Sequence, residues 1–180
     1  MKADVALPSG VTCTVQGNTT VTLRGPKGEV TRQFPHQKIS VTVEGNTILI
    51  SAKNATKSEK TMIGTFESHI KNMLKGVTDG HSYRMKICSG HFPMNVSVAG
   101  SEFIIKNFLG EKVPRKLKLR QGVTVKVEGQ EVVVEGVFLE QVSQTAADIE
   151  LLTRIRNRDL RIFQDGIYIT NKDGQAVGQL

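Results

Sequence analysis

With 180 residues, 38% of them hydrophobic and 23% charged, the chain is a folded protein of one domain or two small ones, which excludes a disordered tail. Its net charge of +7 suggests a polyanionic partner without naming one. The distant Cys13 and Cys88 do not suggest a disulfide scaffold, and no targeting signal or membrane-spanning run is evident, so we expect a cytoplasmic protein with no membrane partner.

The first half of the chain is predicted to form strands and then a helix. Alternating apolar and polar residues, separated by turn signals such as Gly17-Asn18, predict strands over residues 11–16, 20–24, 29–34, 39–43 and 48–51. Apolar residues then recur every three or four positions from Met62 to Val77. This spacing predicts an amphipathic helix of about 20 residues that ends at Asp79 and Gly80.

The second half repeats this order. We predict a helix over residues 139–156, strands on either side of it and a polar C-terminal tail, the strands covering residues 95–99, 102–107, 115–120, 123–127, 132–135 and 166–170. Similar strings recur at a slowly drifting offset, which is 83 for Val15 and Val98 and 86 for Asp79 and Asp165. We therefore predict an α+β protein of two tandem duplicated domains, residues 1–81 and 82–180, each an antiparallel sheet with one helix packed on a face.

A basic stretch spans residues 106–120. It holds six basic residues against one acid, Glu111, for a local charge of +5. Leu117 and Leu119 alternate with basic residues, so a strand there would bury the leucines and expose a row of cations about 6.5–7 Å apart. That spacing is comparable to the spacing of phosphates along a nucleic-acid strand. An ordinary solvated edge strand has the same pattern, because edge lysines block aggregation. This stretch alone supports both interpretations.

Other residues in the second half add to the hypothesis of nucleic-acid binding. Four arginines bracket the predicted end of the second helix, at Arg154, Arg156, Arg158 and Arg161. Guanidinium forks match phosphates, although cations also suit a helix C-terminus. Phe108 either stacks on a base or packs in the core.

No set of residues suggests catalysis, a cofactor or a metal site. The segment Gly25-Pro26-Lys27-Gly28 lacks the Gly-Lys-Ser/Thr ending of a phosphate loop and is predicted to be a turn. Cys88 and His91 have no second ligand pair nearby, and the histidines have no neighbours that would form a triad. We therefore expect no enzyme. A protein scaffold that binds through its sheet edges is the alternative to a nucleic-acid-binding protein.

Five strings in the chain together resemble one known family. They are Gly25-Pro26-Lys27-Gly28, HIKNMLKGVT at 69–78, His91-Phe92-Pro93, NFLGEK at 107–112 and DGIY at 165–168. In this order they closely resemble ribosomal protein six of the large subunit, called nine in the eukaryotic scheme. The NFLGEK string resembles the archaeal and eukaryotic branch.

The resemblance implies a non-catalytic protein of the cytoplasmic ribosome, nucleolar during assembly if the source is eukaryotic. It implies binding to large-subunit rRNA near the sarcin–ricin loop and the stalk base. Neighbouring large-subunit proteins and the landing site of the translational GTPases would lie close by. The second domain would be the main rRNA-binding copy. The residues expected to bind rRNA are Lys106, Asn107, Phe108, Gly110, Lys112, Arg115, Lys116, Lys118, Arg120, His91, Arg154, Arg156, Arg158, Arg161 and Tyr168.

Overall fold

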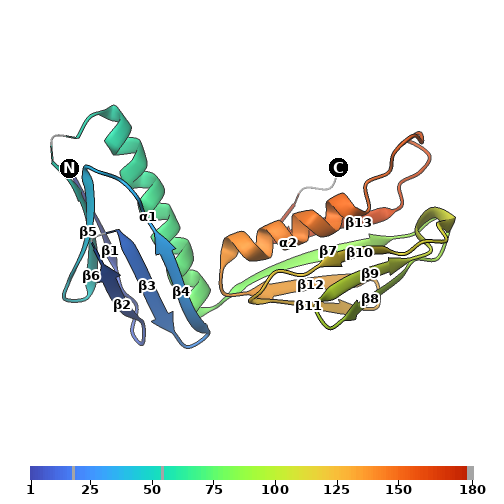
Figure 1. Cartoon of the computed structure of the whole chain (residues 1–180), viewed down its shortest axis with the longest axis horizontal. Helices are drawn as coiled ribbons and strands as arrows, with labels where there is room; N and C mark the ends of the chain where they lie inside the picture. Colours follow the sequence, from blue (N-terminus) through green and yellow to red (C-terminus); the bar gives the residue numbers. More distant parts are fainter. Residues whose placement is uncertain (18, 54, 178–180) are drawn as a thin grey trace. The chain divides into compact units, whose positions relative to one another are not determined.

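The computed structural model describes residues 1–17, 19–53 and 55–177. The chain forms two compact units, Met1–Gly80 and His81–Leu180, which are called unit 1 and unit 2 below (Figure 1). Each unit has one long helix and antiparallel strands, which confirms the predicted α+β fold. The predicted turn at Gly17-Asn18 and the predicted polar tail include residues 18 and 178–180, which lie outside the described residues.

Unit 1 consists of two three-stranded antiparallel sheets and a helix. The strand orders are β1-β6-β5 and β2-β3-β4. The elements are β1 (Lys2–Ala6), β2 (Thr12–Gln16), β3 (Thr20–Gly25), β4 (Gly28–Gln33), β5 (Ile39–Glu44), β6 (Thr47–Ala52) and α1 (Lys57–Thr78). Strand β1 was not predicted, because only Val5 among its residues is buried and its apolar alternation is weak.

Helix α1 follows the predicted apolar spacing. It begins with a capping box, in which Thr56 and Glu59 exchange hydrogen bonds. Its buried face packs against strands of both sheets in unit 1. The predicted turn at residues 25–28 is confirmed and lies against the end of the helix, where the Lys27 backbone N–H donates to the Val77 carbonyl at 3.0 Å.

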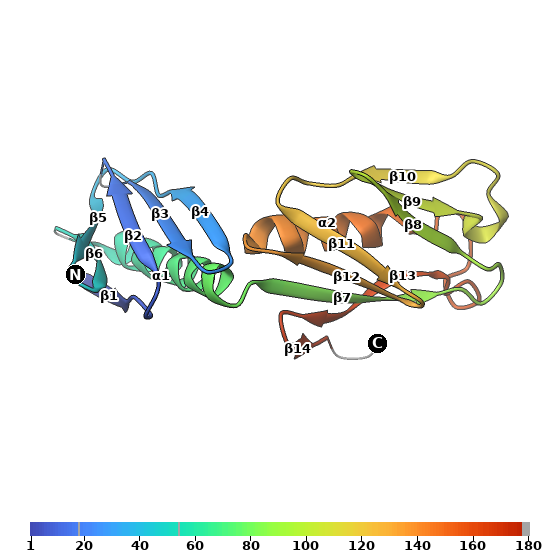
Figure 2. The ribbon, with the colours of Figure 1, turned by 90° about the horizontal axis from the view of Figure 1, so that it is seen from below.

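Unit 2 repeats the two sheets and extends one of them. The strand orders are β10-β9-β8 and β11-β12-β7-β13-β14 (Figure 2). The elements are β7 (His81–Cys88), β8 (Asn95–Ala99), β9 (Glu102–Lys106), η1 (Phe108–Gly110), β10 (Arg115–Lys118), β11 (Val123–Glu128), β12 (Glu131–Gly136), α2 (Leu139–Leu152), β13 (Gly166–Lys172) and β14 (Gln175–Ala176). The core lies between α2 and the strands, where Met85, Phe103 and Ile149 are fully buried.

The strand orders of the two units correspond. The order β1-β6-β5 matches β7-β12-β11, and β2-β3-β4 matches β8-β9-β10. This correspondence supports the duplication inferred from the repeated strings. The structure adds that each copy contains two sheets rather than a single continuous one, and that β13 and β14 join only the second copy.

The end of helix α2 differs from the prediction. The helix stops at Leu152, not at residue 156, because Thr153 caps it. The Thr153 hydroxyl donates to the Glu150 carbonyl at 3.0 Å and accepts a hydrogen bond from the Ile167 N–H at 3.0 Å. Residues 153–165 therefore form a loop to β13. Its four arginines lie in this loop and do not bracket a helix end.

Candidate nucleic-acid interface

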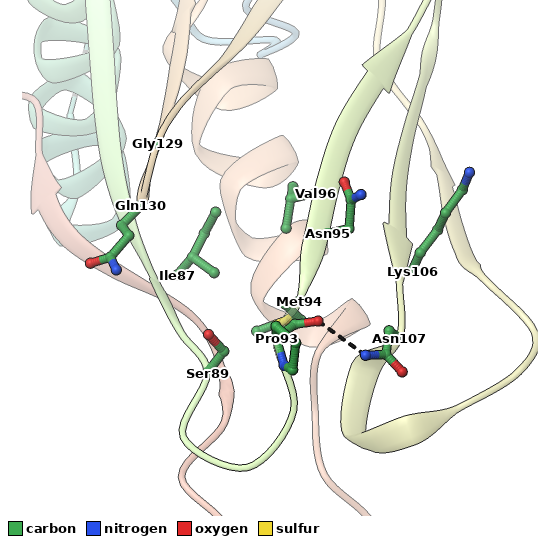
Figure 3. A pocket seen from close by; sticks show the side chains of 10 residues that line it. All are labelled: Ile87, Ser89, Pro93, Met94, Asn95, Val96, Lys106, Asn107, Gly129 and Gln130. Carbon is green, nitrogen blue, oxygen red and sulfur yellow. Dashed lines mark hydrogen bonds between the residues drawn. The ribbon is translucent and has the colours of Figure 1, made fainter.

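Three loops of unit 2 meet at one end of the unit. They are residues 89–94, 107–114 and 153–165 (Figures 1 and 2). The Asn107 side-chain amide donates to the Pro93 carbonyl at 3.1 Å, as Figure 3 shows. A Cβ atom on Gly110 would lie 3.5 Å from Phe92 Cζ, so these two residues are also neighbours. The fold therefore brings together the His91, Asn107 and arginine segments that the sequence separates.

A cleft of about 730 Å³ opens beside the contact between Asn107 and Pro93. Asn107 lines it together with Lys106, Pro93 and Asn95 (Figure 3). Two of the residues predicted to bind rRNA, Lys106 and Asn107, therefore lie at this cleft, where β9 ends and the 107–114 loop begins. Lys106 is exposed at the end of β9 and has no acidic partner within ion-pair distance in the described part of the chain.

The Arg115 guanidinium forms hydrogen bonds within the protein. Its guanidinium forms two hydrogen bonds with Glu111, at 2.8 and 2.5 Å, and a third with the Leu152 carbonyl at 2.6 Å. These bonds join the 107–114 loop to the end of α2. The hydrogen bonds from Arg115 also lower the pKa of Glu111. Arg115 was predicted to bind rRNA, and that stays a prediction; the bonds that the structure shows for its guanidinium are internal.

The prediction that Phe108 contacts RNA needs correction. Its ring is 1% exposed and belongs to the core of unit 2. The Arg115 guanidinium covers it, with Cζ 4.2 Å from the ring centroid. Asn107 and Leu109 adopt the left-handed region, with φ of 60° and 50°, on either side of Phe108. The ring therefore packs beneath the loop and cannot stack on a base.

The basic stretch and the arginine loop share a second cleft, of about 420 Å³. Glu111 and Arg115 of the basic stretch line it together with Arg154, Arg156 and Arg158 of the loop. The three loop arginines are exposed, and so is Lys112 in the neighbouring loop. We call Lys112, Arg154, Arg156 and Arg158 the basic end of unit 2.

His91 is anchored by Asp165. The His91 ring Nδ1 donates to Asp165 Oδ2 at 2.6 Å, and the backbone N–H groups of Gly90 and His91 donate to Oδ1 at 2.5 and 3.0 Å. Burial alone would raise the pKa of Asp165, but these hydrogen bonds outweigh it and lower the pKa. The carboxylate therefore stays charged and ties the 89–94 loop to the 153–165 loop.

A stack of side chains reinforces this tie. The His91 ring stacks on Phe163, with centroids 4.6 Å apart, and Arg158 Cζ lies 4.8 Å from the Phe163 centroid. Neither Asp165 nor Phe163 was among the residues that the sequence predicted for the interface. A signal that could have identified Phe163 is its position as an aromatic residue directly after the arginine-rich segment 154–161.

Strand β10 shows the predicted alternation, with Lys116 and Lys118 exposed and Leu117 half-buried. It is also an edge strand, as the alternative interpretation expected. Lys116 Nζ lies 3.6 Å from Glu102 Oε2, and Arg120 pairs with Asp148 at 3.0 Å. These acids partly neutralise the predicted row of cations.

The two remaining predicted residues lie on the surface. Arg161 pairs with Asp159 at 2.7 Å, while its side chain stays 89% exposed. Tyr168 is exposed on β13. In residues 1–17, 19–53 and 55–177 no cluster of potential metal ligands occurs. None of the described helices combines the length and apolar character that crossing a membrane requires.

The family model described as ribosomal protein L6 matches residues 7–80 and 92–166. The chain belongs to the ribosomal protein L6 family. The two matched segments fall in unit 1 and unit 2, one in each. Membership confirms the resemblance found in the sequence, and it indicates a structural ribosomal protein rather than an enzyme.

Curated relatives of similar length support the assignment. The large ribosomal subunit protein uL6 of Natronomonas pharaonis is 46% identical over 170 residues, covering 94% of this chain and 96% of the relative. The uL6 protein of Aeropyrum pernix is 44% identical over 170 residues, which cover 94% of this chain and 93% of the relative. The uL6 protein of Methanococcus vannielii is 42% identical over 177 residues, which cover 98% of this chain and 97% of the relative. These archaeal relatives agree with the predicted branch.

Proposed function

We propose that this chain is a structural constituent of the large ribosomal subunit and that unit 2 binds large-subunit rRNA through its basic end. One observation carries the proposal. The basic stretch and the arginine loop, about 40 residues apart in sequence, line the same cleft. Family membership supports the choice of rRNA as the polyanion.

The geometry of the basic end suits structured RNA. Folded RNA presents phosphates and 2′-hydroxyls across a wide, shallow groove, so shape and charge govern recognition more than base reading does. Arg154, Arg156 and Arg158 supply planar forks that bind phosphate oxygens in pairs. Hydrogen bonds anchor both ends of their loop, because Arg115 donates to the Leu152 carbonyl just before it and Asp165 at its end accepts from the His91 N–H. A preorganised loop loses less conformational entropy when it binds.

The remaining predicted residues extend this surface. Lys106, Asn107, Gly110 and His91 lie in or beside the same three loops, and Lys116 and Lys118 continue the positive surface along β10. The resemblance supports a finer location near the sarcin–ricin loop and the stalk base of cytoplasmic ribosomes. There, neighbouring large-subunit proteins and the landing site of the translational GTPases would lie close by.

Charge reversal at the basic end tests the proposal. We expect the double variant Lys112→Glu with Arg156→Glu to shift from the large-subunit fraction of a sucrose gradient to the free-protein fraction. Both residues are exposed and without a described acidic partner, so the fold should persist. The control is Lys57→Glu with Lys60→Glu on exposed positions of α1, which makes the same charge change in unit 1.

Equal incorporation of both double variants would contradict binding through the basic end. RNase treatment separates the proposal from the scaffold alternative. If the native chain stays in a large particle after the RNA is digested, a protein partner is the main anchor and rRNA is not.

A further inference from the structure

A groove of about 1160 Å³ lies beside Tyr168 in unit 2. Its wall includes apolar side chains that are open to solvent, with Ile162 63% and Val177 36% exposed. Lys86 and Lys172 also line it. An apolar, aromatic surface bordered by cations matches the two chemical parts of a nucleotide, which are a flat base and a phosphate.

We infer that this groove binds a single unstacked nucleotide of the rRNA, with the base on the Tyr168 ring and the adjoining phosphate at Lys86 and Lys172. The inference rests on the proposed function and adds that this groove binds one unstacked nucleotide of the RNA. His91 lines the groove as well and belongs to the three-loop end, so the groove is continuous with the proposed interface.

Tyr168 is held as a rigid platform. Its hydroxyl donates to the Gln164 carbonyl at 3.3 Å. A Cβ atom at Gly166 would lie 2.9 Å from Tyr168 Cζ, so the ring lies directly against the Gly166 backbone. The side chain is nevertheless 39% exposed. Burial of the hydroxyl end, together with the nearby Cys88, Asp165 and Glu150, raises the pKa of Tyr168, so the hydroxyl stays neutral.

The two lysines of the groove supply the cations for a phosphate. Lys86 stands directly opposite Tyr168 in the antiparallel pairing of β7 with β13, which places both side chains on one face. Two acids, Asp165 and Glu150, also line the groove, and their carboxylate oxygens are directed at hydrogen-bond donors of the protein itself. Asp165 accepts the three hydrogen bonds described above, and Glu150 Oε1 accepts one from the Ile169 N–H at 3.3 Å.

The same contacts disfavour an extended peptide in the groove. A peptide that adds a strand to a sheet needs free backbone N–H groups along the sheet edge. On β13 the N–H groups of Ile167 and Ile169 already donate to the side chains of Thr153 and Glu150. Glu150 in α2 and Thr153 directly after it therefore occupy the donors that an added strand would need at these positions, which leaves the aromatic and cationic side chains as the available binding groups.

The tyrosine content of the chain permits a direct test. The chain has two tyrosines and no tryptophan, so in the Tyr83→Phe variant Tyr168 is the only strong fluorophore. We expect saturating deproteinised large-subunit rRNA to quench this emission, because a stacked base quenches tyrosine. Inorganic polyphosphate, which has no bases, should leave it unchanged. The Tyr168→Phe variant retains only the buried Tyr83 and gives the reference for light that the RNA absorbs.

Binding constants provide a second, independent measurement. Loss of one base–aromatic stack should weaken rRNA binding by Tyr168→Leu about 5- to 150-fold, whereas Tyr168→Phe should stay within about threefold of the native chain. Native rRNA affinity without quenching in Tyr83→Phe would overturn the inference, and so would a native-like affinity of Tyr168→Leu. Absence of rRNA binding by the native chain would instead refute the proposed function, so the two failures are distinguishable.

Discussion

Replacing Arg115 with lysine tests whether this residue holds the interface together or contacts RNA. Lysine keeps the charge but loses the planar fork, so it cannot keep the bonds to Glu111 and to the Leu152 carbonyl together with the contact over the Phe108 ring. A charge-assisted hydrogen bond contributes about 1.5–3 kcal/mol and a cation–π contact about 0.5–2 kcal/mol. Because lysine retains part of each, we expect unit 2 to lose about 2 kcal/mol of unfolding free energy.

Urea unfolding followed by tyrosine emission measures this loss, since Tyr83 and Tyr168 both lie in unit 2. The midpoint should fall by roughly 1 M. Lys112→Gln is the control, because Lys112 is exposed in the same loop. It should unfold within about 0.5 kcal/mol of the native chain yet bind rRNA more weakly. Native stability of Arg115→Lys together with weaker rRNA binding would refute the internal role and make Arg115 an RNA contact.

Three further predictions concern other parts of the fold. Hydrogen bonds from Thr56 lower the pKa of Glu59 from 4.5 to about 2, so the Glu59 carboxylate stabilises unit 1 fully above pH 4.5 and loses this effect as the pH falls through about 2. Glu59→Ala should therefore lower the far-UV circular dichroism melting temperature at neutral pH but not at about pH 2, and an equal difference at both would refute the assignment. Gly25→Ala should cost about 1–3 kcal/mol in urea unfolding, because the new Cβ would lie 2.6 Å from the Val77 carbonyl oxygen. Its control, Gly64→Ala on the open face of α1, should add about 0.5–1 kcal/mol, and similar shifts for both would contradict the packing described here. Asp165→Asn should cost about 1–3 kcal/mol and weaken rRNA binding, because its hydrogen bonds position His91. Unchanged stability by tyrosine-detected urea unfolding would argue against that anchor.

Local periodicity predicted most of the fold. Most strands of both copies follow alternation, and helix α1 follows three-to-four spacing, both of which can be counted directly; β1 is an exception. The end of α2 was placed too late because Leu151, Leu152 and Ile155 continue the helical apolar spacing. What ends the helix is a tertiary contact, the bond between the Thr153 hydroxyl and the Ile167 N–H. No local pattern carries that information.

The candidate site was predictable in its charge but not in its internal organisation. The sequence indicated which segments are basic, and the structure brings them together. The sequence did not indicate that Arg115 bonds to Glu111 and Leu152. Whether an arginine side chain points to solvent or bonds within the protein depends on the segments that pack against it. The pairing of His91 with Asp165 joins residues 74 positions apart, and only the strand pairing of β7 with β13 makes them neighbours.

The salt dependence of rRNA binding tests most directly the claim that unit 2 grips RNA phosphates through its basic end. Each phosphate contact that is lost should reduce the slope of log K against log salt by roughly 0.7–0.9. Lys112→Gln with Arg156→Gln should therefore reduce the slope by about 1.4–1.8, while Lys57→Gln with Lys60→Gln in unit 1 should leave it unchanged. An unchanged slope for the first variant, or an equal reduction for both, would contradict binding through these residues.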